Sequence, residues 1–249
     1  MTSGNWPLPR WIAHRGAGKL APENTLAAFR VGAAHGYRAF ECDVKLSADG
    51  VPFLLHDTTL DRTTPERGVA GDRPWVELSR LDAGGWHSRA FAGEPIPSLE
   101  SIARYVRRNG FALNIEIKPT PGTEFATGVA VAEACLRLWD GAAAGPLLSS
   151  FRPEALQGAR QGAPAVARAL LVDTLWPQWL ETARALGCAA VVANYTLMSP
   201  ALIDELHGAG LRALVYTVND EAPAAQLIAA GIDGIITDAV DRFAPADGS

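Results

Sequence analysis

The stretch AFECDVKLSADGVPFLLHD (residues 39–57) decides the fold, because it joins a strand, a tight turn and a returning strand. Side chains alternate between the two faces of a strand, so Glu41, Asp43 and Lys45 point one way and the residues between them the other. One face of this strand is therefore charged and the other is apolar. The strand predicts a polar site on one side and a hydrophobic core on the other.

The pair Asp49-Gly50 predicts the turn that reverses the chain. Such a pair is the strongest short-range signal for a two-residue hairpin loop, whose two central residues need positive φ. In a regular hairpin of this kind the numbers of paired residues sum to 99, and Asp43 is then expected opposite His56. Local geometry alone would thus bring acids and an imidazole together.

Strand-like apolar runs alternate with helix-like segments along the whole chain. Besides the stretch above, the runs cover residues 11–14, 112–118, 146–151, 167–173, 189–195, 212–219 and 234–240. About eight strand-helix units in 249 residues is the size of a closed (β/α)8 TIM barrel, although an open doubly wound sheet has the same pattern. We expect a single domain spanning residues 1–249.

Helix boundaries and one long irregular segment complete this outline. Pro22 is expected to start the first helix, which Gly36 ends, because proline suits the first helical turn and glycine the position after the last. The segment 58–97 is polar and carries few regular patterns. It predicts a small insertion after strand two that crosses the strand ends, a kind of segment that often carries function.

Composition excludes several classes of protein. A net charge of −5 argues against a nucleic-acid surface, which normally shows a basic patch. The first ten residues lack the order of a secretion signal, and no run approaches the roughly 18 apolar residues of a membrane span. Three scattered cysteines are typical of reduced core thiols. We expect a cytoplasmic protein without stable membrane association. A homodimer is compatible with the sequence, which leaves the oligomeric state open.

Three acidic residues at strand positions suggest a metal site. Glu41, Asp43 and Glu116 are all expected to face inward, where isolated charges lose their hydration at high cost. A divalent cation would compensate them, and a set of oxygen ligands suits Mg²⁺ or Ca²⁺. The alternative is a metal-free network in which three basic side chains neutralise the acids, namely Arg15, Lys45 and Lys118.

Two histidines are candidates for proton transfer. His14 follows the first strand and His56 the hairpin, and an imidazole can serve as general acid or general base near neutral pH. The other three histidines (His35, His87 and His207) are interpreted as structural. The run GAGK at 16–19 lacks the leading glycine and the closing Ser or Thr of a nucleotide-binding loop, so we do not interpret it as one.

Eight short motifs carry a family resemblance. They are HRG at 14–16, PENT at 22–25, ECD at 41–43, DG at 49–50, HD at 56–57, LDRTT at 60–64, EIK at 116–118 and VYTVN at 215–219. In this order they resemble the glycerophosphodiester phosphodiesterase family, and within it the short cytoplasmic bacterial enzymes associated with glycerol phosphate uptake. A single motif would be weak evidence, but the ordered set spans the chain and is specific.

The resemblance implies a (β/α)8 barrel with an insertion after strand two, and a role for each matching residue. The implied roles are acid-base catalysis by His14 and His56, metal binding by Glu41, Asp43 and Glu116, phosphate binding by Arg15 and Lys118, and pocket walls from Trp86 and Tyr216. The implied reaction is metal-dependent hydrolysis of a small glycerophosphodiester to glycerol 3-phosphate and an alcohol.

Two other functions fit the same residues. One is a phosphodiesterase of the sphingomyelinase D type, acting on the head groups of intact phospholipids. The other is a barrel without catalytic activity that binds glycerol phosphate as a carrier or sensor. The sequence does not settle the head group, the metal, or which histidine is the acid.

Overall fold

Eight parallel strands close into a barrel in the part of the chain that the computed structural model describes, which is residue 6, residues 8–243 and residue 245. The strands are β1 (Trp11–Ala13), β2 (Ala39–Leu46), β4 (Ala112–Ile117), β5 (Leu147–Ser150), β6 (Ala167–Val172), β7 (Ala190–Asn194), β8 (Arg212–Tyr216) and β9 (Gly234–Thr237). The first strand pairs with both β2 and β9. This pairing closes the barrel, so the predicted TIM barrel is confirmed and the open sheet is excluded. Most of the ten residues used to argue against a secretion signal lie outside the described residues.

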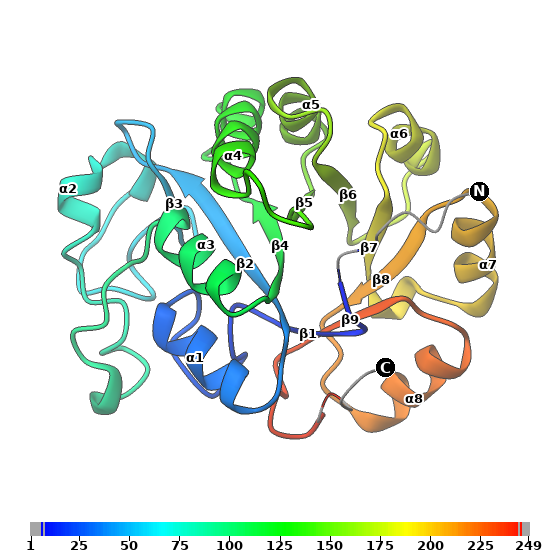
Figure 1. The fold of residues 1–249 in the computed structure, drawn as a ribbon, viewed down its shortest axis with the longest axis horizontal. Coiled ribbons are helices and arrows are strands. Elements are labelled where there is room, and N and C mark those ends of the chain that lie inside the picture. The colour runs from blue at the N-terminus through cyan, green and yellow to red at the C-terminus, as the bar shows by residue number, and fades with distance from the viewer. Residues whose placement is uncertain (1–5, 7, 244, 246–249) are drawn as a thin grey trace.

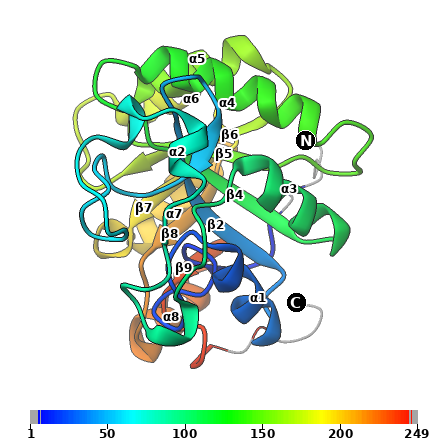
Figure 2. The ribbon, with the colours of Figure 1, turned by 90° about the vertical axis from the view of Figure 1, so that its left-hand side faces the viewer.

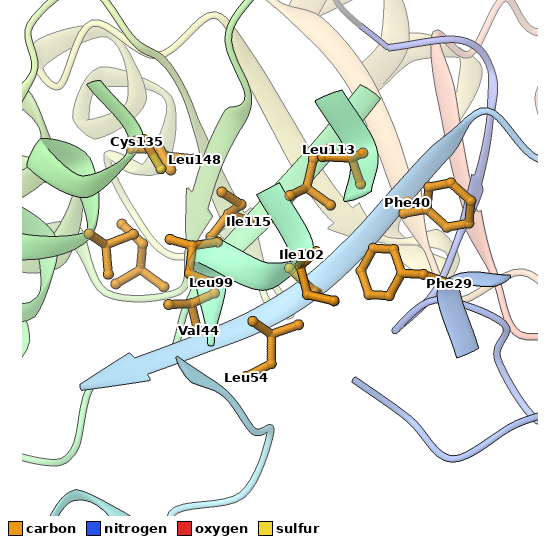
Figure 3. Packing of buried hydrophobic residues seen from close by; sticks show 14 of the residues in the cluster. Phe29, Phe40, Val44, Leu54, Leu99, Ile102, Leu113, Ile115, Cys135 and Leu148 are labelled. Atoms are coloured by element: carbon orange, nitrogen blue, oxygen red, sulfur yellow. The ribbon is translucent and has the colours of Figure 1, made fainter. Parts of the chain in front are cut away.

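Seven helices surround the barrel, as Figure 1 shows. They are α1 (Leu26–Ala34), α3 (Leu99–Arg108), α4 (Glu124–Leu138), α5 (Pro153–Gly162), α6 (Trp179–Ala185), α7 (Pro200–Gly208) and α8 (Glu221–Ala229). Their apolar faces pack on the outward side chains of the strands. Figure 3 shows this on one side, where Leu99 and Ile102 of α3 lie against Val44, Leu54 and Ile115. Among the described residues, no helix is both long and apolar enough to cross a membrane.

The first helix starts later than predicted. Thr25 is its N-cap, with an extended backbone and a side-chain oxygen that accepts the Ala28 N–H at 3.2 Å. The Thr25 hydroxyl also donates to the carbonyl of Pro22 at 2.7 Å, which holds the preceding residues in a turn. A threonine at this position satisfies the free N–H groups of the first turn, so it takes the role assigned to Pro22. Gly36 follows the helix with φ +91°, as predicted for its end.

The hairpin between β2 and β3 (Pro52–Leu54) has one more loop residue than predicted. Lys45 pairs with Phe53, so the numbers of paired residues sum to 98. The loop is residues 48–50, closed by Ser47 N–H donating to the Val51 carbonyl at 3.1 Å, with Gly50 at φ +79°. This is the three-residue hairpin in which glycine takes the left-handed position. Asp43 therefore lies opposite Leu55, and the predicted pairing with His56 is wrong.

The predicted insertion forms a small lobe beside the barrel, visible at the left of Figure 1 and facing the viewer in Figure 2. It contains a short helix, α2 (Trp75–Leu78), and two 3₁₀ turns, η1 (Ala70–Asp72) and η2 (Arg89–Phe91). The lobe has its own apolar cluster, formed by Phe53, Leu55, Leu60, Ala70, Leu78, Ala83 and Ile96. It is attached to the barrel where the backbone N–H of Ala27 donates to Glu94 at 2.9 Å.

The interior of the barrel changes from apolar to polar along the strands. Its apolar layer includes Ile12, Ala39, Leu147, Ala169, Val192, Leu214 and Ile236. Toward the carboxyl ends of β2 and β4 the same inward face carries acids and lysines instead. This is the face on which TIM barrels carry their active sites.

Candidate active site

Three buried carboxylates meet at the carboxyl ends of β2 and β4. The parallel register places Asp43 beside Glu116, and Glu41 beside Asn114. One carboxylate oxygen from each of Glu41, Asp43 and Glu116 lies within 4.8 Å of the others. The alternation of side chains along two neighbouring strands therefore brings the three predicted acids together.

Electrostatics make this cluster costly without a cation. Burial raises the pKa of Glu41 well above its usual value, and repulsion from Asp43 and Glu116 adds to the effect. Burial, with repulsion from Asp43, raises the pKa of Glu116 to about 7. Burial also disfavours the charged form of Asp43, but Arg15 and Lys118 outweigh it and lower the pKa of Asp43 to about 2. The site holds one firmly ionised carboxylate and two that need a further positive charge.

The donor set fits a divalent cation. Among the described residues, the buried Oε1 atom of Glu41 has no hydrogen-bond partner. Oε1 of Glu116 is paired with the Lys118 ammonium, 2.8 Å away. Oxygen ligands of this kind suit hard ions such as Mg²⁺ and Ca²⁺. The metal-free network is present in part: Arg15 and Lys118 lie 2.8 to 3.8 Å from carboxylate oxygens of Asp43 or Glu116, whereas Lys45 Nζ donates to the carbonyl groups of His56 and Lys118 instead.

Backbone and amide groups fix the orientation of two of the acids. Asn24 donates from Nδ2 to Asp43 Oδ2 at 2.8 Å, and its Oδ1 accepts the Asp43 N–H at 3.0 Å. Glu41 Oε2 accepts the backbone N–H of Arg15 at 3.0 Å. The turn that precedes α1 thus supplies a support for the acid cluster.

His14 is held by an acid from the other end of the chain. Its Nδ1 lies 2.6 Å from Asp238 Oδ1, and Asp238 accepts a hydrogen bond from Asn219 at 3.1 Å. The other ring nitrogen, Nε2, lies 3.8 Å from Glu41 Oε2. An aspartate on Nδ1 fixes the ring and leaves Nε2 for proton transfer.

His56 has the same type of support from its neighbour in the sequence. Its Nδ1 lies 2.7 Å from Asp57 Oδ1, and Arg62 Nε donates to Asp57 Oδ2 at 2.7 Å. Burial lowers the pKa of His56, and the positive charges of Arg15 and Lys118 lower it further against the pull of Asp43. The ring is therefore neutral near pH 7 and able to accept a proton.

Two adjoining cavities lie over this centre. The inner one, of about 300 Å³, is lined by both histidines, by polar groups and by an apolar wall of Phe151, Leu171 and Ile236. The outer one, of about 500 Å³, shares Lys118 and Phe151 with it and extends to Asp173 and Trp176. A molecule whose phosphate lies near Lys118 can place one substituent in each cavity.

The structure brings most of the predicted site residues together. The predicted site residues that line the inner cavity are His14, Arg15, Glu41, His56, Glu116, Lys118 and Tyr216. Asp43 lies just behind them, with Arg15 Nε 3.4 Å and Lys118 Nζ 3.8 Å from its carboxylate.

Trp86 is the exception. It lies in the insertion, 41% exposed, and it lines neither cavity. Its Nε1 donates to the Ala83 carbonyl, and the Arg62 guanidinium lies 5.9 Å from the ring. Its role as a pocket wall stays a prediction.

Several supporting residues were not assigned a role from sequence. They are Glu23, Asn24, Asp57, Arg62, Asn219 and Asp238. The Glu23 carboxylate accepts hydrogen bonds from both Arg15 and Arg62. It thereby links Arg15, near His14, to Arg62, which supports His56 through Asp57. All but Asp238 lie inside the quoted motifs, but a motif alone does not say which side chains touch.

The run GAGK has a packing role. Gly18 adopts φ +55°, and a Cβ there would overlap the backbone of Asp238. Among the remaining histidines, His207 binds Asp233 at 2.7 Å near the start of β8, far along the barrel from the acids. His87 contacts the Lys19 carbonyl at 3.1 Å.

Comparison with known proteins gives consistent matches over nearly the whole chain. Residues 14–242 match the model of the glycerophosphoryl diester phosphodiesterase family. A glycerophosphodiester phosphodiesterase of Caldanaerobacter subterraneus is 33% identical over 231 residues, which cover 91% of this chain and 93% of the relative.

Solved structures agree. A phosphodiesterase of Oleispira antarctica, in complex with the product sn-glycerol-3-phosphate, superposes with a TM-score of 0.89 at 35% identity, covering 94% of this chain and 95% of the other. A glycerophosphodiester phosphodiesterase of Agrobacterium tumefaciens has a TM-score of 0.81 at 30% identity, covering 95% and 99%.

Proposed function

The chain belongs to the glycerophosphoryl diester phosphodiesterase family, and on this basis we propose that it hydrolyses glycerophosphodiesters to sn-glycerol 3-phosphate and a free alcohol. The observation that carries the proposal is the placing of two carboxylate-supported histidines and three acids around one cavity. A phosphodiester needs the same set of groups: positive charge for the phosphate, a base and an acid.

Arg15 and Lys118 bind the phosphate in this proposal. Both are partly buried and directed at the acid cluster. A Mg²⁺ or Ca²⁺ ion held by Glu41, Asp43 and Glu116 would supply further positive charge beside the phosphate oxygens. The basic side chains orient the diester and stabilise the charge that develops on it.

The two histidines divide the proton transfers. His56 is neutral near pH 7, because its pKa is lowered by burial, so it takes the proton of the attacking oxygen. His14 protonates the leaving alcohol from Nε2; this step requires the ring to start protonated on both nitrogens, a form that the Asp238 carboxylate at Nδ1 stabilises. Each ring is prevented from rotating by its aspartate.

The two cavities suggest how the substrate lies. The inner cavity, of about 300 Å³, ends in the barrel and has room for a small polar group with three carbons, so in this proposal it takes the glycerol. The outer cavity is wider and takes the leaving alcohol, near Asp173 and Trp176. The complex of the Oleispira antarctica relative with sn-glycerol-3-phosphate supports a small-molecule substrate. We place the reaction in the cytoplasm, with no nucleic acid or membrane partner.

An assay of released sn-glycerol 3-phosphate, with the released choline or ethanolamine measured in parallel, tests the proposal. The purified protein is incubated with glycerophosphocholine, glycerophosphoethanolamine or lysophosphatidylcholine, each with Mg²⁺, Ca²⁺ or a chelator. Turnover of the first two that stops in chelator supports it. Faster turnover of the lysophospholipid would favour the sphingomyelinase D type, and binding of glycerol phosphate without any turnover would favour the carrier. Unchanged activity in chelator would contradict the metal site.

A further inference from the structure

Asn114 is a buried polar residue whose side chain has no hydrogen-bond partner among the residues that the structure describes. It is 1% exposed and lines the inner cavity, yet neither its Oδ1 nor its Nδ2 makes a hydrogen bond. An amide buried without a partner costs about 1 to 3 kcal/mol. Asn114 lies on β4, two residues before Glu116, so it lies deeper in the barrel. Because the unpaired amide of Asn114 lowers stability and faces the inner cavity, we expect it to bind a ligand there.

The neighbours of Asn114 cannot satisfy it. Leu147 beside it on β5 is apolar. Glu41 beside it on β2 offers one carboxylate oxygen, and the other is bound to the Arg15 N–H. A carboxylate can accept from the amide nitrogen but cannot donate to the amide oxygen. Both amide atoms are unpaired, so a ligand that satisfies both must accept from Nδ2 and donate to Oδ1.

This requirement separates the candidate ligands. A phosphate diester offers acceptors only, and a metal ion binds only the amide oxygen. A hydroxyl group donates and accepts, and two neighbouring hydroxyls can satisfy Oδ1 and Nδ2 at once. Water meets the same requirement, and among the groups of a glycerophosphodiester the hydroxyls of the glycerol are the ones that can replace it on Asn114.

We propose that Asn114 binds the free hydroxyl groups of the glycerol moiety and thereby selects glycerol-containing diesters. The inference rests on the proposed function. Two residues along a strand span about 6.6 Å, so Asn114 lies about one glycerol length below Glu116. The Lys118 ammonium lies 2.8 Å from Glu116 Oε1 and is therefore near the level of Glu116. With the phosphate at Lys118, the glycerol chain reaches down to Asn114 along the apolar wall. A diester without these hydroxyls leaves the amide unpaired and is bound poorly.

Ser149 provides a matched control. Its hydroxyl is also fully buried and without a partner, on the strand next to β4, but it does not line the inner cavity. Ser149→Ala removes an unpaired buried polar group without removing a contact to the proposed ligand. Asn114→Leu removes the amide at almost constant volume, and Asn114→Ala serves if the leucine variant does not fold.

The test compares the natural protein with Asn114→Leu on two substrates, with Ser149→Ala as the control. Glycerophosphocholine is compared with propylphosphocholine, which lacks both free hydroxyls, at saturating metal. We expect Asn114→Leu to lower kcat/KM for glycerophosphocholine about 10- to 100-fold, through KM, and to leave propylphosphocholine unchanged. Ser149→Ala should change neither. An equal loss on both substrates would assign Asn114 to the metal or to Glu41 and overturn the inference, as would no loss on either.

A binding measurement tests the inference without turnover. At equal concentrations, sn-glycerol 3-phosphate should raise the Tm of the natural protein more than inorganic phosphate does. Asn114→Leu should remove this difference while its own Tm without ligand is not lowered. A difference that persists in Asn114→Leu contradicts the role of Asn114. A protein that cleaves neither substrate but shows this binding pattern contradicts only the proposed function.

Discussion

The Nδ1 atom of His14 lies 2.6 Å from Oδ1 of Asp238, although the two residues are 224 positions apart. The contact exists because β1 pairs with β9 and closes the barrel, which brings the ends of the first and last strands together. The carboxylate accepts the Nδ1 proton, so it holds the ring of His14 and stabilises the form that carries a second proton on Nε2. Closure of the barrel therefore also brings the two members of this pair together.

Replacing Asp238 by Asn should lower kcat about 10²- to 10⁴-fold, the range typical of general acid-base groups. An amide carries no charge, so it stabilises the doubly protonated form of His14 less well than the carboxylate does. Steady-state kinetics on glycerophosphocholine measure the effect, with circular dichroism to confirm folding. His14→Ala should show at least as large a loss. The double variant should be no slower than His14→Ala alone, and additive losses would mean that Asp238 acts elsewhere.

The acidic limb of the pH profile should report His56. Burial lowers the pKa of His56 below its ordinary value of 6.5, so the imidazole stays neutral to a lower pH than a free histidine does. Activity is lost as pH falls through this lowered pKa. The limb of kcat/KM, measured at saturating metal, should lie below pH 6.5.

Asp57→Asn gives the matching control. The hydrogen bond to Asp57 raises the pKa of His56, so its loss should move the acidic limb to still lower pH while the rate falls. A limb that moves upward in this variant, or that persists unchanged in His56→Ala, would remove His56 from the role of base.

Metal binding should release a proton near neutral pH. Burial and Asp43 raise the pKa of Glu116 to about 7 in the metal-free protein, so below that pH a proton competes with the ion. Metal affinity should therefore fall as the pH is lowered from 8 to 6. Calorimetry in buffers of different ionisation enthalpy counts the protons released. Glu116→Gln should bind metal more weakly and release fewer protons, and equal release in both would contradict this assignment.

The barrel and the positions of the acids could be predicted from the sequence because both follow from regular patterns. Alternating strands and helices predict a closed barrel or an open sheet, and the family resemblance favours the barrel. The two-residue period places Glu41 with Asp43 and Glu116 with Lys118. Two local details were wrong for local reasons. Gly50 takes the left-handed position of a three-residue loop, which shifts the hairpin by one residue. Thr25 caps α1 in place of Pro22.

The contacts that support the site are of another kind. Asp238 reaches His14 only through barrel closure, and no pattern in the sequence states which acid will do so. Asn114 lies on the same inward face as Glu116, two residues earlier in the strand, and this spacing was the available signal. Its lack of a partner depends on Glu41 and Leu147 beside it, which only the register of three strands defines.

Gly18→Ala should disturb His14 by displacing Asp238. A Cβ at Gly18 would overlap the backbone of Asp238, so that segment must shift. We expect a loss of stability of more than about 2 kcal/mol and a fall in kcat. Gly110→Ala is the control, because Gly110 has a similar φ of +68° with open space around it. It should cost about 1 kcal/mol and leave kcat unchanged, and equal effects would refute the overlap.

The opposite end of the barrel offers a test of stability that is independent of catalysis. Asp233 binds His207 and Arg212, each at 2.7 Å, and accepts the Ala213 N–H at 2.8 Å. Burial would raise the pKa of Asp233, but these hydrogen bonds outweigh it and hold the pKa below its usual value of 3.8. A lowered carboxyl pKa stabilises the fold above the unfolded pKa, and this contribution is lost as pH falls through the folded pKa.

Asp233→Asn should therefore reduce the free energy of unfolding by about 1 to 3 kcal/mol at pH 7, measured by urea denaturation. The difference from the natural protein should shrink as the pH is lowered from 4 to 3, because the natural protein then loses its carboxylate as well. Asp204→Asn, at an exposed position of α7, is the matched control and should change stability by less than about 0.5 kcal/mol. If the effect of Asp233→Asn were the same at pH 7 and pH 3, packing and not charge would explain it.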